Sequence, residues 1–300
     1  MLNICIPVYN YNVNSLVKSL HEQCLNENIE FKILVFEDGS DLEFVEINKS
    51  VSNFLEVSHL INTTNIGRSA ARNYLISQTE KGKILFIDCD SIVPDKNYIR
   101  NYINNFDKQI VCGGTIYEAS QKQAGHELRY KYGINREMII AKQRNINPNK
   151  AFATNNFMAA KEIFDKVCFR EFLQKYGHED SLFGYELKNN QIEIFHIDNP
   201  VIHNGVETND VFLQKTEDGL KNLIIIENSQ EIDKVFTKEI RIVNTYLQLK
   251  KYALNWFPLF FYKIFKNNIK KHLLVSKNPS LYLFDLYKFG YYCELKKLSV

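Results

Sequence analysis

Apolar runs alternate with amphipathic stretches through the first 95 residues. Runs rich in branched and aromatic residues predict four strands, at 2–8, 31–36, 57–61 and 83–87. The segments between them carry apolar residues at helical spacing, at 14–24, 41–53 and 66–79. Strands that alternate with helices of this length are typical of a doubly wound, mostly parallel sheet. The chain therefore begins with a predicted α/β domain.

The pattern changes twice further along the chain. Strands are predicted over 110–116 and 198–204, with a helix that opens at Gly177-His178-Glu179-Asp180. The polar stretch 118–150 has only weak helical periodicity and predicts a loop. Beyond residue 205 the pattern is helical, over 208–226, 229–254 and 259–274, with a break near Pro258. We predict an α/β domain over 1–205 and a helical C-terminal region over 206–300.

The charge follows the same division. The net charge is +2, but residues 234–300 contain thirteen Lys or Arg and only three Asp or Glu. Aromatic residues and lysines interleave over 259–271, which suits an interfacial helix on an anionic membrane. The alternative is a tail that packs its aromatic residues on the catalytic core and leaves its lysines in solvent. The acidic remainder and the lack of a known motif argue against a nucleic-acid partner.

Three further features concern the compartment. The N-terminus has no basic segment followed by a long apolar one, so no signal peptide is expected. No window of about 18 uninterrupted apolar residues predicts a transmembrane helix. The six cysteines show no paired spacing and predict reduced thiols. We expect a cytoplasmic protein, either free or peripheral on the inner face of the plasma membrane.

Two carboxylates, Asp88 and Asp90, follow the apolar strand 83–87. An unpaired charge at the end of a buried strand is costly, and the carboxyl ends of strands form the ligand crevice of open α/β sheets. Two carboxylates there suit a hard cation that also binds a phosphate-bearing ligand. The alternative is that both residues only cap the following helix.

Neighbouring strand ends carry polar residues as well, at Tyr9-Asn10 and Glu37-Asp38, and all three ends should converge on one crevice. Neither a Rossmann glycine fingerprint nor a Walker A sequence follows the first strand, so a metal would replace the amide cradle for a diphosphate. Arg68 and Arg72 share one helix face. Arg68 suits phosphate oxygens, and Arg72 suits either these or an internal carboxylate.

Taken in order, these motifs resemble the signature of family 2 glycosyltransferases. The resemblance is collinear over about the first 95 residues and rests on 6–10 (Ile-Pro-Val-Tyr-Asn), 37–40 (Glu-Asp-Gly-Ser), 65–68 (Asn-Ile-Gly-Arg), 71–73 (Ala-Arg-Asn) and 88–90 (Asp-Cys-Asp). It implies a Rossmann-like GT-A fold and an inverting, metal-dependent sugar transfer. Glu37 stands where Asp is usual, which leaves Asp38 in place.

The resemblance also implies roles for single residues. The implied donor nucleotide site contains Pro7, Tyr9, Asp38, Arg68, Asp88 and Asp90. Within it, Tyr9 and Asp38 resemble the residues that hold a uracil base, and Asp88 resembles the ribose ligand. Asp90 and His203 resemble the metal ligands, for Mn²⁺ or Mg²⁺, and the histidine favours Mn²⁺.

The same resemblance assigns the acceptor side. Asp180 resembles the general base, and Glu179 would contact the acceptor or orient the site. Further acceptor residues would be Asn155, Asn156 and His178. The stretch from 117 to 150 matches nothing known, so the acceptor itself is left open.

The resulting hypothesis is transfer from a UDP-sugar to a hydroxyl of a glycan or lipid-linked acceptor, in surface polysaccharide synthesis. Two alternatives remain at this point. One is a catalytically inactive scaffold that binds sugar or lipid. The other is a nucleotidyltransferase, which would need a basic glycine-rich loop after the first strand.

Overall fold

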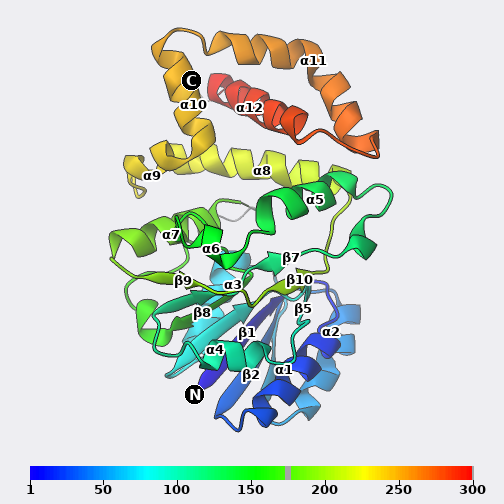
Figure 1. The fold of residues 1–300 in the computed structure, drawn as a ribbon, viewed down its shortest axis with the longest axis vertical. Helices are drawn as coiled ribbons and strands as arrows, with labels where there is room; N and C mark the ends of the chain where they lie inside the picture. Colours follow the sequence, from blue (N-terminus) through cyan, green and yellow to red (C-terminus); the bar gives the residue numbers. More distant parts are fainter. Residues whose placement is uncertain (173–176, 299–300) are drawn as a thin grey trace. The chain divides into compact units, whose positions relative to one another are not determined.

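The computed structural model describes residues 1–172 and 177–298 (Figure 1). The chain forms two compact units. The first contains residues 1–117, 136–172 and 179–205. The second contains residues 118–135 and 206–298, together with Gly177 and His178.

A seven-stranded sheet forms the centre of the first unit. Its strands, in sheet order, are β3 (Val57–Asn62), β2 (Phe31–Asp38), β1 (Leu2–Val8), β4 (Lys83–Ile87), β8 (Asn156–Ala160), β6 (Ile110–Cys112) and β9 (Ile194–His196). The first four are parallel, and β8 runs antiparallel to both of its neighbours. This mostly parallel sheet, flanked by helices, confirms the predicted α/β class.

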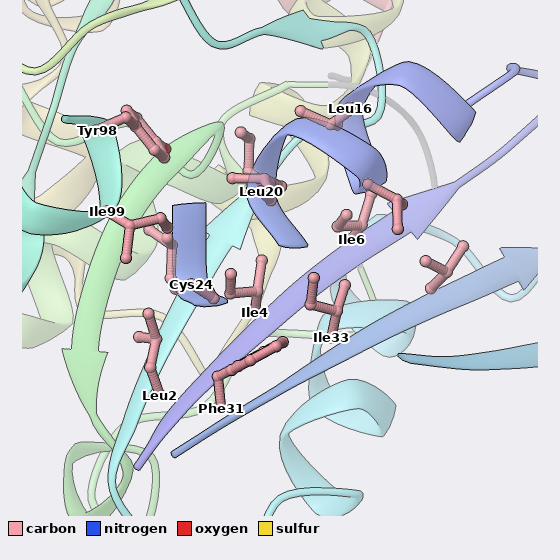
Figure 2. Close-up of a cluster of buried hydrophobic side chains, with 14 of the residues drawn as sticks. Leu2, Ile4, Ile6, Leu16, Leu20, Cys24, Phe31, Ile33, Tyr98 and Ile99 are labelled. Atoms are coloured by element: carbon pink, nitrogen blue, oxygen red, sulfur yellow. The ribbon is translucent and has the colours of Figure 1, made fainter. Parts of the chain in front are cut away.

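Both faces of this sheet are buried. Along β1, Ile4 and Ile6 pack toward α1 (Asn14–Asn26) and α4 (Tyr98–Ile103), as Figure 2 shows. The intervening Cys5 packs on the opposite face, in the core of α3 (Arg68–Ser77) and α7 (Glu179–Asn189). Because successive side chains of a strand point to opposite faces, a strand covered on both sides is apolar throughout. The helix α2 (Leu42–Asn48) and a 3₁₀ turn (Lys49–Asn53) complete the N-terminal half.

A small second sheet lies in the same unit, in the order β5 (Ser91–Ile92), β10 (Val201–His203) and β7 (Thr115–Ile116). The single strand predicted over 110–116 is therefore wrong, because the chain leaves the large sheet at Cys112 and enters the small one at Thr115. Gly114 makes the change of direction with φ +95°, a conformation that side-chain-bearing residues rarely adopt.

The stretch 118–150 is not one loop, contrary to the prediction. It contains α5 (Glu127–Tyr132), a π-helical turn (Gly133–Glu137), α6 (Ala141–Arg144) and a short 3₁₀ turn (Ala119–Gln121). Each of these pieces has three to six residues, which is too short for a helical period to be recognised in the sequence.

The second unit is helical. Besides α5 it contains α8 (Asn209–Asn228), α9 (Lys234–Glu239), α10 (Arg241–Lys251), α11 (Trp256–Val275) and α12 (Leu281–Leu298). α12 packs on both α8 and α11, and a Cβ atom at Gly290 would lie 2.4 Å from the Cβ atom of Tyr262. The helical pattern is interrupted at 252–255, between α10 and α11, a few residues before the break predicted near Pro258. Pro258 itself lies in the first turn of α11, where its missing N–H costs no helical hydrogen bond.

Among the helices described here, none has the length and apolar character required to span a membrane.

Candidate active site

Asp90 and His203 come together because of strand register. β5 follows Asp90 directly and pairs antiparallel with β10, so that His203 lies opposite Ser91. The backbone N–H of Asn204 donates to the carbonyl oxygen of Asp90 at 2.8 Å, which fixes the two chain segments. The Nδ1 atom of His203 then lies 3.4 Å from Oδ2 of Asp90. Asp90 and His203, which are far apart in the sequence, thus form one polar pair, the Asp90–His203 pair.

This pair fits a divalent cation. Two adjacent ligands of an octahedral ion with bonds of about 2.1 Å are about 3 Å apart, close to the separation seen here. Gly205 leaves space beside the carboxylate, since a Cβ atom there would lie 2.3 Å from Oδ2 of Asp90. Within residues 1–172 and 177–298, no group of three His, Cys, Asp or Glu residues could hold a metal.

The second strand end binds the start of α3. The carboxylate of Asp38 accepts hydrogen bonds from the backbone N–H groups of Ile66 at 2.7 Å and Gly67 at 3.1 Å. Burial raises the pKa of Asp38, and the two amide hydrogen bonds oppose that rise. Pro7 lies near the end of the ladder between β1 and β2, opposite Phe36, and Tyr9, just beyond the end of β1, is exposed. These positions leave the Tyr9 ring free to contact a ligand beside Asp38.

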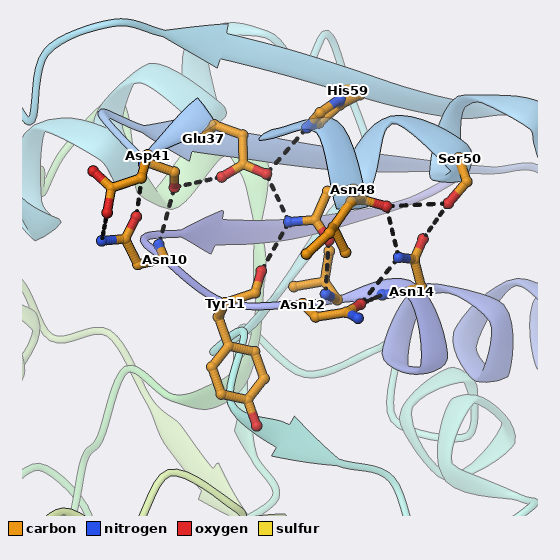
Figure 3. Close-up of polar contacts among 12 residues, drawn as sticks. Asn10, Tyr11, Asn12, Asn14, Glu37, Asp41, Asn48, Ser50 and His59 are labelled. Atoms are coloured by element: carbon orange, nitrogen blue, oxygen red, sulfur yellow. Dashed lines mark hydrogen bonds and ion pairs between the residues drawn. The ribbon is translucent and has the colours of Figure 1, made fainter. Parts of the chain in front are cut away.

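Glu37, the residue that departs from the family pattern, belongs to a buried network (Figure 3). Its carboxylate accepts from Asn48 at 2.8 Å and from Ser40 at 2.5 Å, and contacts Nε2 of His59 at 3.1 Å. Burial disfavours its charge, but the hydrogen bonds from His59, Ser40 and Asn48 outweigh this and lower the pKa of Glu37. Ser40 also accepts the backbone N–H of Asn10. Through Ser40, Glu37 therefore connects the chain after β1 to the end of β2.

The two arginines of α3 have different partners. Arg72 is buried, 2% exposed, and its Nη2 donates to Oδ1 of Asp88 at 2.8 Å. Of the two partners that the sequence allowed for Arg72, the internal carboxylate is the one seen. Arg68 is half-exposed, and its Nη1 lies 3.8 Å from Oε1 of Glu179. Helix α4 begins only at Tyr98, so Asp88 and Asp90 do not cap it and that alternative is wrong.

Asp180 lies in the first turn of α7, and its carboxylate accepts from the hydroxyl of Thr154 at 2.7 Å. Burial, together with the negative charge of Glu179, raises the pKa of Asp180 to about 6. The charge of Arg72 and the Thr154 hydrogen bond oppose this rise, and the charge of Asp88 adds to it. Asp180 is thus ionised at neutral pH yet more basic than an ordinary aspartate.

The predicted acceptor residues are dispersed. Asn155 donates to the hydroxyl of Thr115 at 2.7 Å, and its carbonyl oxygen accepts the N–H of Asp88 at 3.0 Å. Asn156 is buried, and its amide oxygen accepts from two tyrosine hydroxyls, of Tyr98 and Tyr102. Asn156 therefore links β8 to α4 within the core.

His178 belongs to the second unit and has φ +71°. Burial and the charge of Lys288 lower its pKa to about 4. An acceptor role for Asn155, Asn156 and His178 stays a prediction.

Two residues of this region were missed by sequence reasoning. Tyr11 accepts from Asn204 at 3.1 Å, and burial together with the charge of Asp90 raises its pKa. Thr154 binds the Asp180 carboxylate. Tyr11 follows the Pro7–Asn10 motif directly, so its place in the sequence could have indicated that it lies near the site. The sequence around Thr154 gives no such indication.

Comparison with known proteins identifies the family and the fold. Residues 3–168 match the sequence profile described as Glycosyl transferase family 2. No curated protein gives a significant match. Two similar solved structures are the mannosyltransferase PcManGT from Pyrobaculum calidifontis in complex with GDP-Man and Mn²⁺, and S. aureus TarS 1–349 in complex with UDP-GlcNAc.

The likeness to both structures extends over almost the whole chain. PcManGT has a TM-score of 0.58 at 12% identity, over 99% of this chain and 86% of that one. TarS has a TM-score of 0.53 at 15% identity, over 99% of this chain and 91% of that one. At these identities the likeness shows the fold, which is of the GT-A type with additional C-terminal helices.

Proposed function

Because the chain belongs to glycosyl transferase family 2, and is therefore a nucleotide-sugar-dependent glycosyltransferase, we propose that it transfers sugar from a UDP-sugar to a hydroxyl group of a glycan or glycolipid. The observation that carries this proposal is one cluster of charged groups. The Asp90–His203 pair, the Asp88–Arg72 ion pair and the raised pKa of Asp180 belong to the same unit. Membership of this family removes the nucleotidyltransferase alternative.

The donor would lie along the ends of β1, β2 and β4. Asp38 and Tyr9 would hold the base, and Asp88 would hold the ribose while Arg72 keeps its carboxylate in place. Support for a pyrimidine donor comes from the UDP-GlcNAc complex of TarS, while PcManGT is in complex with GDP-Man. The nucleotide is therefore the first quantity to measure.

Asp180 would act as the general base. The acceptor oxygen attacks the anomeric carbon, its proton passes to the Asp180 carboxylate, and the bond from that carbon to the diphosphate oxygen breaks, with inversion. Thr154 would hold one oxygen of the carboxylate through its hydrogen bond and leave the other for the acceptor hydroxyl. A base of this kind contributes about 10²–10⁴-fold to the rate.

The leaving diphosphate needs positive charge around it. Asp90 and His203 would hold a divalent ion, Mn²⁺ or Mg²⁺, and PcManGT is in complex with Mn²⁺. Such an ion supplies Lewis-acid neutralisation of the departing charge. Arg68, half-exposed and 3.8 Å from Glu179, would add a second positive charge.

A thermal-shift titration tests the donor side. Purified protein is titrated with UDP, GDP, CMP and dTDP, each with and without Mn²⁺, because a ligand that binds the native state raises the Tm. We expect stabilisation by UDP that requires Mn²⁺. A shift with GDP or dTDP alone would replace the donor, and no shift with any nucleotide would contradict the proposed site and favour the inactive scaffold.

The acceptor is approached after the donor. With the donor nucleotide known, transfer from its labelled sugar is screened against polysaccharide fragments and lipid-linked oligosaccharides. We expect a surface polysaccharide precursor to accept the label. Hydrolysis of the donor without transfer to any glycan or glycolipid would contradict the proposed acceptor class.

A further inference from the structure

The first three turns of α11 expose a continuous apolar surface. It consists of six large side chains that are each 36–59% exposed, namely Trp256, Phe257, Phe260, Phe261, Ile264 and Phe265, and we call it the aromatic face. The opposite side of the helix is buried, where Tyr262, Ile269 and Leu273 pack in the core of the second unit. None of these six side chains belongs to that buried core.

The aromatic face is an ordered surface. The ring centroids of Phe261 and Phe265 are 4.5 Å apart, and the Trp256 ring lies 5.9 Å from that of Phe257 and 6.5 Å from that of Phe260. At 100° per residue, positions 256, 260 and 264 form a ridge along the helix, with 257, 261 and 265 beside it. Contiguous apolar patches of this kind mark interaction or membrane sites, whereas single exposed apolar residues do not.

Positive charge surrounds this face. Residues 240–284 contain no Asp or Glu, but they contain eight Lys or Arg. Lys263 lies beside the ridge, next to the line formed by Trp256 and Phe260. Lys271 follows Ile264 by seven residues, or two helical turns, and so lies on the same side of the helix as the ridge. Both lysines are exposed. Their long stems can lie along apolar surface while the ammonium groups reach outward.

This combination identifies the partner. A second copy of the chain, docking face to face by two-fold symmetry, would bring the exposed Lys263 and Lys271 of both copies to one interface to which residues 240–284 contribute no Asp or Glu, and like charges oppose such an interface. An anionic bilayer offers acyl chains for the rings and phosphates for the lysines. We propose that α11 lies flat in the interface of an anionic phospholipid bilayer, with its aromatic face toward the acyl chains and its lysines at the headgroups.

The chain has a built-in reporter for this proposal. Trp256 is the only tryptophan and belongs to the aromatic face. Its fluorescence is measured with vesicles of phosphatidylcholine alone and with vesicles that also contain phosphatidylglycerol. We expect a blue shift of the emission with the anionic vesicles only, and a weaker shift at high salt because screening reduces the lysine contribution. The measurement uses the full chain without donor, so its result is independent of the proposed sugar transfer.

Variants separate the apolar and the charged parts. The double variant F260Q/I264Q keeps the tryptophan and should weaken vesicle binding about 100-fold, because two large side chains lose their burial. The variant K263Q/K271Q should weaken it about 30-fold, at roughly fivefold for each lysine. L55Q/I146Q removes two exposed apolar side chains from the first unit and serves as the matched control, with no expected change.

Three results would overturn the proposal. The first is an emission unchanged by anionic vesicles, and the second is equal binding of F260Q/I264Q and the L55Q/I146Q control. The third is a blue shift that depends on protein concentration in the absence of vesicles, which would make a second copy the partner.

Discussion

The charged side chains at the strand ends of the first unit and those on α11 of the second unit have different surroundings. At the strand ends, each acidic group has a defined partner nearby, such as Arg72 for Asp88 and His203 for Asp90. Along α11, lysines stand beside exposed rings in a segment without acidic residues. Groups compensated at fixed distances suit a small ligand of defined shape, whereas exposed lysines beside exposed rings suit an extended partner such as a bilayer.

The largest effect is expected from D180N, which removes the proposed base and keeps the shape of the side chain. We expect kcat to fall by about 10²–10⁴-fold while the nucleotide-dependent Tm shift is unchanged. The conservative comparison is D198N, an exposed aspartate of the same unit that should leave kcat unaltered. Full activity of D180N would remove Asp180 as the base and weaken the contrast between the two regions.

A smaller effect is expected at the Asp90–His203 pair, the proposed site of the ion. D90N replaces a charged ligand by a neutral amide, so the Mn²⁺-dependent part of the UDP stabilisation should be lost while the Tm without ligand changes little. D107N, at an exposed aspartate paired with its neighbour Lys108, is the matched control. An undiminished response to Mn²⁺ in D90N would place the ion elsewhere.

The pH profile should show the smallest change. Because Asp180 must be ionised to accept a proton and its pKa is raised to about 6, activity should rise with pH through about 6 and then level off. The Arg72 charge lowers this pKa, so R72Q should move the rising limb to higher pH, and R72K should move it less. kcat measured from pH 5 to 8 tests both. A limb that stays in place in R72Q would show that Arg72 does not act on the base.

The N-terminal strands could be predicted because each is a short apolar run followed by polar residues. The run 110–116 was misread for the same reason, since its apolar pattern continues across Gly113 and Gly114 while the backbone leaves the sheet. Helix α12 was missed because residues such as Phe284, Tyr287 and Tyr292 contact two other helices, and a helix buried on several sides loses its single apolar stripe.

The site was predicted unevenly. Asp88 and Asp90 follow a strand and were visible locally, whereas His203 was found only through family resemblance, because nothing in its own segment connects it to Asp90. The partnership of Thr154 with Asp180 depends on the pairing of distant segments and was not predictable.

The antiparallel pairing of β5 with β10 also has a consequence for biosynthesis. Strands β1 to β4, β6 and β8 are complete by residue 160, so a nascent chain could form most of the large sheet at that stage. The Asp90–His203 pair forms only once residue 203 is made, and β5 alone has only two residues, too few for a stable strand. During synthesis the chain would therefore pass through a period in which its sheet is largely formed but its proposed ion site is incomplete. In that period it could neither be stabilised by Mn²⁺ nor consume donor sugar.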